Sequence, residues 1–246
     1  MSNKRSGIGE RLWVHGRDIS GDVGRLNNLS SPRGHFEAPG LNAAAMERIL
    51  THGDGAIDLN GWFNDGADQL HDAFSGLPAT DLVALLAIGT ARGDPGAAIV
   101  SKLINHLHNR TSEGAIEVQA QLEADGAPLE WGVMLTAGAE TLASAGSLTS
   151  LDENGADGSS SNGGVGYLEY LSLGSGSPTL LIQDSPNASS WATLLTFDGG
   201  TPPLGERKTV TGNVDRHLRP HSTGSFSNAV IAMGFRRGTA QDDVAL

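Results

Sequence analysis

The clearest pattern in the chain is a strict alternation of apolar and polar side chains between residues 115 and 123. One parity is apolar, and the other parity holds Glu117, Gln119, Gln121 and Glu123. A period of two is typical of a strand with one face buried and the other face in solvent. We therefore predict a half-buried antiparallel strand over 115–123.

Short apolar runs bounded by Gly, Ser, Pro and Asn predict further strands on both sides of this segment. In the first part of the chain they lie at 56–63, 82–88 and 129–135. In the second part they lie at 167–173, 179–183, 191–197, 208–218 and 226–235. Short strands at this spacing, separated by turn residues, are typical of a β-sandwich.

The sequence contains few helix signals. Asn42 precedes a run of good helix formers and predicts a short helix over 42–50. A second helix fits 66–75, with Asp65 as its cap and Pro78 beyond its end. Both helices are short and need tertiary packing to persist in water.

The segment 94–107 fits two structures. Asp94-Pro95 is a good helix start, and the apolar residues that follow have the spacing of an amphipathic helix. The same residues also fit the first arm of a hairpin that returns through 109–114 into the strand at 115–123. Periodicity alone favours the helix.

A change in composition marks a boundary near the middle of the chain. The segment 146–166 reads GSLTSLDENGADGSSSNGGVG, and such residues bury little apolar surface. We interpret it as a flexible linker or a long exposed loop. The predicted organisation is an N-terminal domain over 1–146, a linker over 147–164, a C-terminal domain over 165–238 and an acidic tail over 239–246.

Composition and charge exclude several classes of site. The 246 residues include 34 glycines and no cysteine, so disulfides, Cys-based zinc sites and thiol nucleophiles are absent. The formal net charge is −12, without the basic stripe that a nucleic-acid reader uses to hold phosphates. Tight DNA binding is therefore not expected, whereas a surface that lies beside DNA without adhering to it remains compatible with this charge.

We expect no secretory signal and no membrane anchor. The basic residues near the start, Lys4 and Arg5, are not followed by an apolar stretch, and no window approaches the ~20 apolar residues of a membrane helix. We therefore expect synthesis as a soluble protein in a cytoplasm.

The search for a metal or catalytic site yields only weak candidates. His106 and His108 would share one face of a strand and could ligate a metal. Such a pair is more often part of a solvated polar edge. The segment 152–158 lacks the ligand set of a calcium loop. Asp68 and Asp72 are spaced for acid–base work but are more typical of a solvated helix surface.

The tryptophans have two interpretations each. Trp191 could stack on a sugar, although its apolar neighbours favour a core position. Trp62 and Trp131 are interpreted as core or subunit-contact residues. No nucleophile elbow, phosphate loop or dinucleotide fingerprint is present. We therefore predict no catalytic, cofactor-binding or metal-binding residues.

Four strings, in this order, resemble a known family. They are GRDISGDV at 16–23, LPATD at 77–81, NRTSEGAI at 109–116 and LEWGVMLTAG at 129–138. Together they are similar to the major tail (tail tube) protein of long-tailed, non-contractile bacteriophages that infect actinobacteria. The resemblance covers about 10–140 and continues through 167–168 and 182–185. The chain departs from the family pattern at 106–109, where a tyrosine and an aspartate are expected, and at Ala79, where glycine is commoner.

The resemblance implies a mainly β fold. The N-terminal domain would be a tail-tube-type pair of sheets with one or two short helices, and the C-terminal domain an accessory β-sandwich on the outer surface. Six copies would close a ring whose inner strands form one barrel, and the rings would stack into a tube. The resemblance also favours a strand over 99–109, and we adopt it in place of the helix.

The function implied is structural and non-enzymatic, without a cofactor. The protein would be made and assembled in the host cytoplasm and reside in the virion tail, in contact with copies of itself and with other tail proteins at the tube ends. The phage genome would pass through without tight binding. The alternative is a virion decoration or adhesin-like module that binds host-surface glycan through the C-terminal sandwich.

Charge locates a candidate lining for the tube. Six chains of charge −12 would carry 72 negative charges per ring, but screening over ~8 Å leaves only lumen-facing carboxylates to act on DNA. We expect Glu117, Gln119, Gln121 and Glu123 to form part of that lining, with a solvated outer face as an equally weighted alternative. The segments 20–34 and 89–96 are candidates for ring-to-ring contact.

Overall fold

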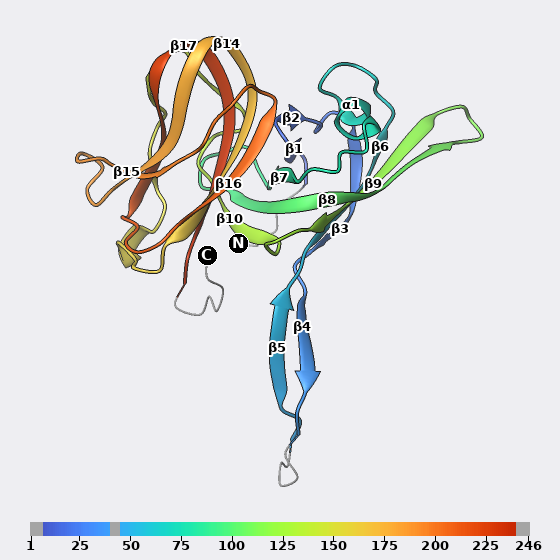
Figure 1. Cartoon of the computed structure of the whole chain (residues 1–246), viewed down its shortest axis with the longest axis horizontal. Coiled ribbons are helices and arrows are strands. Elements are labelled where there is room, and N and C mark those ends of the chain that lie inside the picture. Colours follow the sequence, from blue (N-terminus) through green and yellow to red (C-terminus); the bar gives the residue numbers. More distant parts are fainter. Residues whose placement is uncertain (1–6, 40–44, 240–246) are drawn as a thin grey trace.

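The computed structural model describes residues 7–39 and 45–239, and antiparallel strands make up most of it (Figure 1). Within these ranges the helices are α1 (Leu70–Ser75) and the 3-10 turn η1 (Gly155–Asp157). The mainly β class predicted from the sequence is confirmed. The strands are β1 (Arg11–Val14), β2 (Arg17–Asp18), β3 (Val23–Ser30), β4 (Arg33–Glu37), β5 (Arg48–Gly53), β6 (Ala56–Trp62), β7 (Leu82–Ala87), β8 (Pro95–Arg110), β9 (Ile116–Ala124), β10 (Glu130–Met134), β11 (Glu140–Leu142), β12 (Gly146–Ser147), β13 (Leu151–Asp152), β14 (Gly164–Ser185), β15 (Ala192–Thr196), β16 (Leu204–Val210) and β17 (His217–Arg237).

The N-terminal part is organised around β8, which belongs to two runs of strands. The first half of β8 pairs with β7, and β7 continues to β1 and β2. The second half pairs with β9, and β9 continues to β6 and β3. Apolar side chains from both runs meet in one core, which α1 completes with Leu70 and Phe74. The shared strand therefore brings the two runs together around a common interior.

The segment 115–123 forms the predicted half-buried strand, which is β9. In β9, Val118, Ala120 and Leu122 are buried in this core, and the polar residues between them point to the solvent side of the sheet. The strands predicted at 56–63, 82–88 and 129–135 correspond to β6, β7 and β10. Burial of one face by a period-two pattern explains β6 and β9, whereas β7 is a short apolar run that is buried on both faces.

The segment 94–107 is a strand rather than the helix that periodicity favours. It lies in β8, whose first half has neighbours on both edges, β7 on one side and β10 on the other. Ala97 and Ile99 are fully buried against the N-terminal core. Pairing with two strands outweighs a local helical pattern because strand preference depends strongly on tertiary context.

The helix predicted over 42–50 is wrong for its second half. Arg48, Ile49 and Leu50 lie in β5, which pairs with β4 through contacts such as Phe36 with Ile49. Residues 42–44 lie outside the described residues. Helix propensity is a weak preference, and cross-strand pairing overrides it here.

The helix predicted over 66–75 begins four residues later, because α1 starts at Leu70. Asp65 does not cap it. Instead Asp22, 48 positions away in sequence, accepts a hydrogen bond of 3.0 Å from the Leu70 backbone N–H. A cap supplied from a distant segment leaves no local sequence signal, which is why the start was misplaced.

The C-terminal part is built on two long strands, β14 and β17, that pair along their whole length. Strands β16 and β15 pair in succession with the other edge of β14, while β10, β11, β12 and β13 pair with β17. Side chains from both ends of β14, such as Leu168 and Ile182, share one apolar core with Leu218 and Phe235 from the two ends of β17. The paired strands therefore curve around their own interior.

Two strand predictions for this part need correction. The strands predicted at 167–173 and 179–183 are sections of the single strand β14. The strand predicted over 208–218 is wrong for 211–216, because β16 ends at Val210 and β17 begins at His217. A turn containing Gly212, whose φ is 86°, separates them.

The segment 147–164, expected as a linker, is held at several points along β17 and the turn before it. Ser147 pairs with His221, and Leu151 pairs with Leu218. Ser160 forms an isolated bridge with Val214. The domain boundaries at 146/147 and 164/165 remain a prediction, and the tail over 239–246 lies outside the described residues except for Thr239.

The N-terminal and C-terminal parts share a third apolar cluster. Trp13 from β1 and Leu85 from β7 are buried there against Tyr167 from β14 and Ala232 from β17. The β1–β2 turn docks on the C-terminal part so closely that a Cβ at Gly16 would lie 2.4 Å from the Leu204 backbone nitrogen. The two parts therefore form one packed body.

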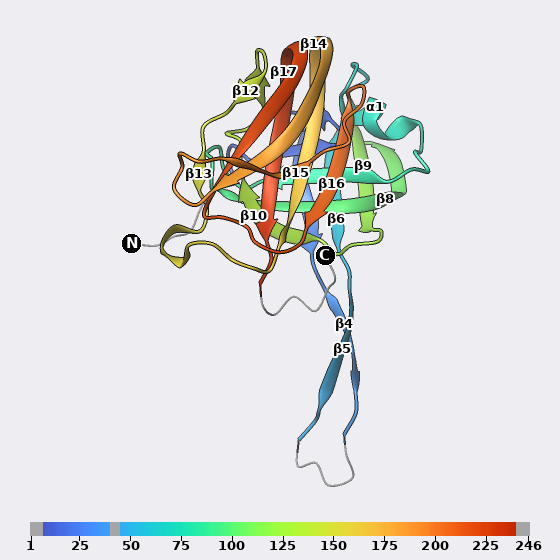
Figure 2. The same ribbon diagram turned by 60° about the vertical axis from the view of Figure 1, so that its left-hand side comes forward.

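A two-stranded arm projects from this body (Figures 1 and 2). It consists of β4 and β5, which follow β3 and precede β6 after short connections. Every described residue of these two strands is exposed. The arm has no core of its own, so it depends on the sheet from which it emerges.

We predict that Gly16→Ala destabilises the protein more than Gly212→Ala does. Both glycines have φ above 80°, where an L side chain costs roughly 1–2 kcal/mol. A Cβ at Gly212 meets no atom within 4 Å, whereas one at Gly16 collides with the backbone of the C-terminal part. Urea unfolding of both variants measures the difference, and equal losses would contradict close docking of the β1–β2 turn.

Candidate functional site

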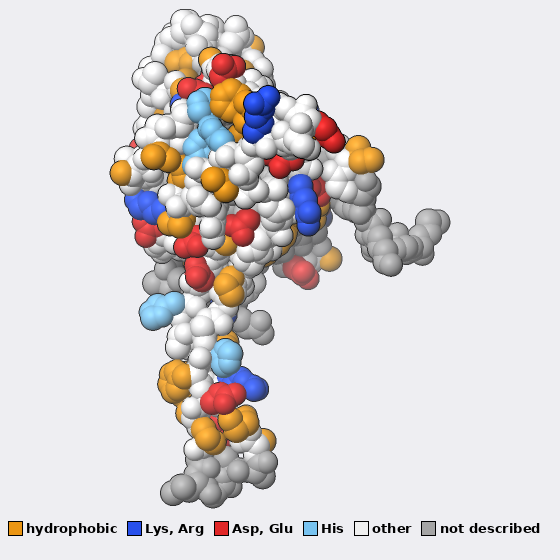
Figure 3. All heavy atoms as spheres, turned by 90° about the vertical axis from the view of Figure 1, so that its right-hand side faces the viewer, with side chains coloured by type: hydrophobic (Ala, Val, Ile, Leu, Met, Phe, Trp, Pro, Cys, Tyr) orange, Lys and Arg blue, Asp and Glu red, His pale blue; other side chains and the backbone are white. Residues whose placement is uncertain are grey.

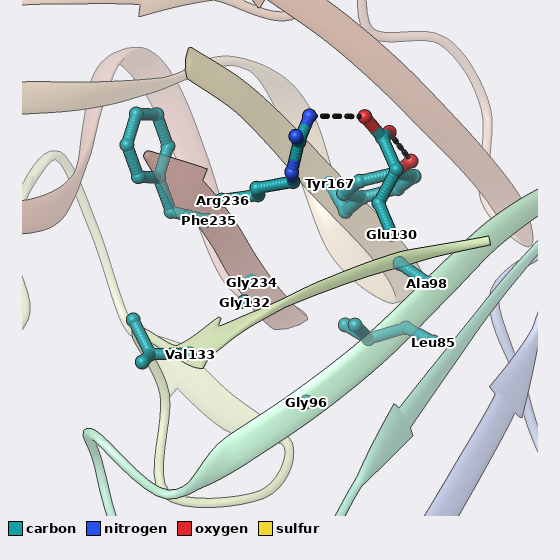
Figure 4. Close-up of a pocket in the computed structure, with 10 residues that line it drawn as sticks. All are labelled: Leu85, Gly96, Ala98, Glu130, Gly132, Val133, Tyr167, Gly234, Phe235 and Arg236. Atoms are coloured by element: carbon teal, nitrogen blue, oxygen red, sulfur yellow. Dashed lines mark hydrogen bonds and ion pairs between the residues drawn. The ribbon is translucent and has the colours of Figure 1, made fainter. Parts of the chain in front are cut away.

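A buried ionic cluster lies where the N-terminal and C-terminal parts meet. Glu130, from β10, is 5% exposed and accepts hydrogen bonds from Arg207 Nε at 2.8 Å and from Arg236 Nη1 at 3.0 Å. Tyr167 donates its phenol hydrogen to the same carboxylate. Figure 4 shows Glu130 between Arg236 and Tyr167. The cluster thus joins β10, β14, β16 and β17 through one carboxylate.

The cavity beside this cluster is too small for a substrate. Its volume is about 10 Å³, roughly that of a single water site. Burial, together with the neighbouring Glu130 charge, raises the pKa of Tyr167, so the phenol remains a hydrogen-bond donor at neutral pH. A closed, fully partnered cluster of this kind orients strands and offers no reactive group to solvent.

A second buried carboxyl, Glu169, stabilises the docked β1–β2 turn. Its Oε2 accepts a hydrogen bond from the Gly16 backbone N–H, while its Oε1 has no hydrogen-bond partner. Burial raises the pKa of Glu169 well above its ordinary value of 4.5. The protonated form is therefore favoured in the folded protein.

A histidine cluster lies between α1 and β8. His106 and His108 share the face of β8 opposite Leu107, as their spacing predicts, and His71 from α1 joins them. Phe63 contacts His71 and His108 with ring-centroid separations of 4.6 and 5.5 Å. Figure 3 shows histidine side chains gathered on the body above the projecting arm.

Burial and the neighbouring histidines affect the charge of this cluster. Desolvation, with His108 and His71 nearby, lowers the pKa of His106. Sequence reasoning missed His71, because only the docking of α1 on β8 brings it within reach. In the part of the chain that the structure describes, this is the one group of three His, Cys, Asp or Glu residues close enough to share a metal ion.

The predicted lining residues lie together on the solvent side of the sheet β3–β6–β9–β8. Glu117, Gln119 and Gln121 are half-buried and Glu123 is exposed. Across the ladder Gln121 faces Asp58. The face is therefore mainly polar, with Trp62 opposite Glu117 and Leu107 opposite Gln119 as exposed apolar side chains.

Both outer edges of this four-stranded sheet are open within residues 7–39 and 45–239. Strand β3 pairs with β6 alone, and residues 102–110 of β8 pair with β9 alone. Unpaired edges present free backbone N–H and C=O groups that can pair with another chain. The sheet could thus be extended from either side.

Large apolar side chains are exposed on the arm, on β6 and on β10. On the arm, Phe36, Ile49 and Leu50 are 52%, 49% and 57% exposed. Trp62 and Trp131, interpreted from the sequence as core or subunit-contact residues, are about half exposed and so do not belong to a core. Exposed apolar groups of this size are typical of contact surfaces.

The remaining sequence candidates do not form an active site. Arg17 Nε lies 3.6 Å from Asp68 and 3.3 Å from Asp72, so both carboxylates belong to a surface ion-pair cluster. Trp191 is half-buried rather than in the core, and the Arg219 guanidinium lies 4.0 Å from the centre of its ring. The prediction that Trp191 lies in the core is therefore wrong, because its ring is only half-buried and packs against the Arg219 guanidinium.

In the 152–158 segment, Asp152 is paired with Arg216 rather than arranged with other oxygen ligands. The hydrogen bond from Arg216 lowers the pKa of Asp152 to about 2. No helix in the described ranges is long and apolar enough to cross a membrane.

Comparison with known proteins yields structural likenesses alone. No family model and no curated protein matches the chain. The sheath/tube terminator of the extracellular contractile injection system PVC has a TM-score of 0.43 and 10% identity, over 53% of this chain and 97% of its own. The Dit protein of phage SPP1 has a TM-score of 0.33 and 10% identity, over 93% of this chain and 99% of its own. A baseplate chain of phage p2 has a TM-score of 0.37 and 7% identity, over 93% of this chain and 98% of its own. TM-scores below 0.5 do not establish a common fold.

We predict that Glu130→Ala lowers the free energy of unfolding by about 3–5 kcal/mol, because it leaves two largely buried guanidinium groups without their carboxylate. Chemical denaturation measures this loss. The matched control is Glu37→Ala, which breaks an exposed ion pair with Arg48 and should cost less than ~1 kcal/mol. Similar losses in the two variants would show that the Glu130 cluster does not hold the two parts together.

We predict that Glu169→Gln flattens the pH dependence of stability. Above pH 4.5 the unfolded carboxyl loses its proton while the buried one keeps it, so the free energy of unfolding falls as pH rises toward the folded pKa. Glutamine does not titrate but retains an oxygen for the Gly16 N–H. Urea unfolding between pH 5 and 8 tests this, with Glu123→Gln as the exposed control. An unchanged slope in Glu169→Gln would contradict the prediction.

Proposed function

We propose that this chain is a structural subunit of a bacteriophage tail, which assembles into hexameric rings that stack into a tube for genome passage. The observation that carries the proposal is the four-stranded sheet with two open edges and a polar solvent-facing side. The ordered strings over 16–138, which resemble tail tube proteins, support the choice of this family and of a sixfold ring. The partners are further copies of the chain and other tail proteins at the tube ends.

The open edges support ring closure. Edge strand β3 of one copy can pair with the 102–110 section of β8 of the next, which makes a heterologous contact. Such a contact closes into a ring if its rotation divides a full turn, and closure leaves no sheet edge exposed. Repeated six times, the four-stranded sheets would form one barrel.

The polar face supports a lining that does not hold DNA. Asp58, Glu117 and Glu123 lie on this face together with two cations. Lys102 is bound by carboxylates at the rim, and Arg25 lies opposite Asn60 on the edge strand β3. Carboxylates turned toward the lumen repel phosphates at close range, since screening leaves interactions within ~8 Å effective. The genome could then pass without adhering.

The arm supports contact between rings. Phe36, Ile49 and Leu50 are exposed side chains of the two strands that project from the body of the chain (Figure 1), so a neighbouring ring can cover them. The segment 20–34, expected to take part in ring-to-ring contact, leads through β3 into this arm. The C-terminal part would then form the outer, accessory layer of the tube.

The proposed role requires no catalytic step. The alternative of a glycan-binding module has weaker support, because Arg219 covers one face of Trp191, the residue expected to stack on a sugar. The C-terminal part serves in our proposal as a packed support for the ring domain through Trp13, Tyr167 and Glu130.

The test is the assembly state of the full chain. Six subunits of 25.4 kDa predict particles of about 152 kDa in light scattering, and annular particles with sixfold symmetry by cryo-electron microscopy at high protein concentration. Ile49→Asp on the arm should permit single rings but prevent stacking, because it removes an apolar side chain from the proposed ring-to-ring contact. Thr51→Asp on the same strand is the matched control, since it adds the same charge without removing an apolar side chain. A monomer at every concentration, with no ring in an assembled tail, would refute the proposal.

A further inference from the structure

The three histidines between α1 and β8 converge on one point. One ring nitrogen from each of His71, His106 and His108 lies within 4.8 Å of the others. The Nε2 atoms of His106 and His108 are 3.2 Å apart. These distances bring together nitrogen atoms from segments 35 residues apart in the sequence.

The spacing matches that of metal ligands. Two imidazole nitrogens that bind one tetrahedral Zn²⁺ at 2.0–2.1 Å are about 3.3 Å from each other. The pair on β8 already has that separation. The third nitrogen requires a shift of about 1 Å or more, which a change of the His71 side-chain torsions can supply.

The Nε2 atoms of His106 and His108 share a hydrogen bond with each other, which a metal ion bound to both would replace. His71 Nδ1 is enclosed and has no hydrogen-bond partner. The rings are flanked by Phe63 and Phe74, whose centroids lie 4.6 Å from His71 and 5.9 Å from His106. Aromatic neighbours restrict the imidazole orientations without competing for the nitrogen lone pairs. His108 is exposed, so an ion can enter from that side.

We propose that His71, His106 and His108 form a binding site for a divalent transition metal, with Zn²⁺ as the expected ion and a water molecule completing four ligands. An all-imidazole set suits Zn²⁺, Cu²⁺, Ni²⁺ or Co²⁺, whereas Mg²⁺ and Ca²⁺ prefer oxygen ligands. The ion cross-links α1 to β8 beside the open edge of the four-stranded sheet. The site thus fixes the helix that covers one end of the N-terminal core.

The inference does not depend on assembly into a tube. It concerns a single chain, and the metal contributes a cross-link rather than chemistry. Because a metal that binds the folded state alone raises its stability by mass action, Zn²⁺ should shift the unfolding temperature upward.

The experiment titrates Zn²⁺ into the full chain after removal of metal with a chelator. Calorimetry should give one ion per chain, and Co²⁺ in its place should give the visible absorption bands of a tetrahedral site. His108→Ala and His106→Ala should each weaken Zn²⁺ binding more than tenfold and abolish the rise in unfolding temperature. His108 is exposed, so its removal leaves the fold intact, and circular dichroism of the metal-free variant checks this.

The matched control is the double variant His35→Ala/His52→Ala, which removes two exposed histidines from the arm. It should bind Zn²⁺ as the unmodified chain does. Loss of binding in this control, or retained binding in His106→Ala and His108→Ala, would assign the metal to adventitious surface histidines and overturn the proposal. Absence of Zn²⁺ binding up to 100-fold excess over protein would overturn it as well.

Discussion

The shared strand β8 is the constraint on which the rest of the structure depends. Its first half is held between β7 and β10, and its second half turns one edge to β9 and leaves the other edge free. The change from two neighbours to one occurs within a single continuous strand. As a result the buried core, the open sheet edge and the histidine face all derive their positions from the same sixteen residues.

The contact between the two halves of the chain gives this arrangement a firm support. Trp13 and Leu85 bury the back of the β1–β7–β8 run against β14 and β17, and Glu130 joins the same layers through two arginines. A buried carboxylate is tolerated there because Arg207, Arg236 and Tyr167 all donate hydrogen bonds to it. The polar face of β9 belongs to the other run of strands, β3–β6–β9–β8. The C-terminal strands that the structure describes do not cover it, so it is accessible to other molecules.

The sequence predicts the elements well where burial alone determines them. The alternation at 115–123 predicts both the strand and its two faces, because its apolar side chains are buried and its polar side chains face solvent. The prediction at 42–50 fails because pairing with a distant strand overrides local preference. At 94–107 periodicity alone is misleading for the same reason, whereas the strand over 99–109 that the resemblance favours is confirmed. The pair His106 and His108 is visible from spacing, whereas His71 and the capping Asp22 depend on how α1 docks. Glu130 and Glu169 give no signal in sequence, since their partners lie 37 to 153 positions away.

The continuity of the arm with the sheet has a mechanical consequence. Strands β4 and β5 run into β3 and β6, and β6 is an interior strand with ladders on both sides. Tension on the tip would act along these strands, so the hydrogen bonds of two ladders would resist it in shear and share the load. A hairpin attached through a loose loop would instead peel away one bond at a time. The protein is thereby suited to bear pulling forces along its longest projection.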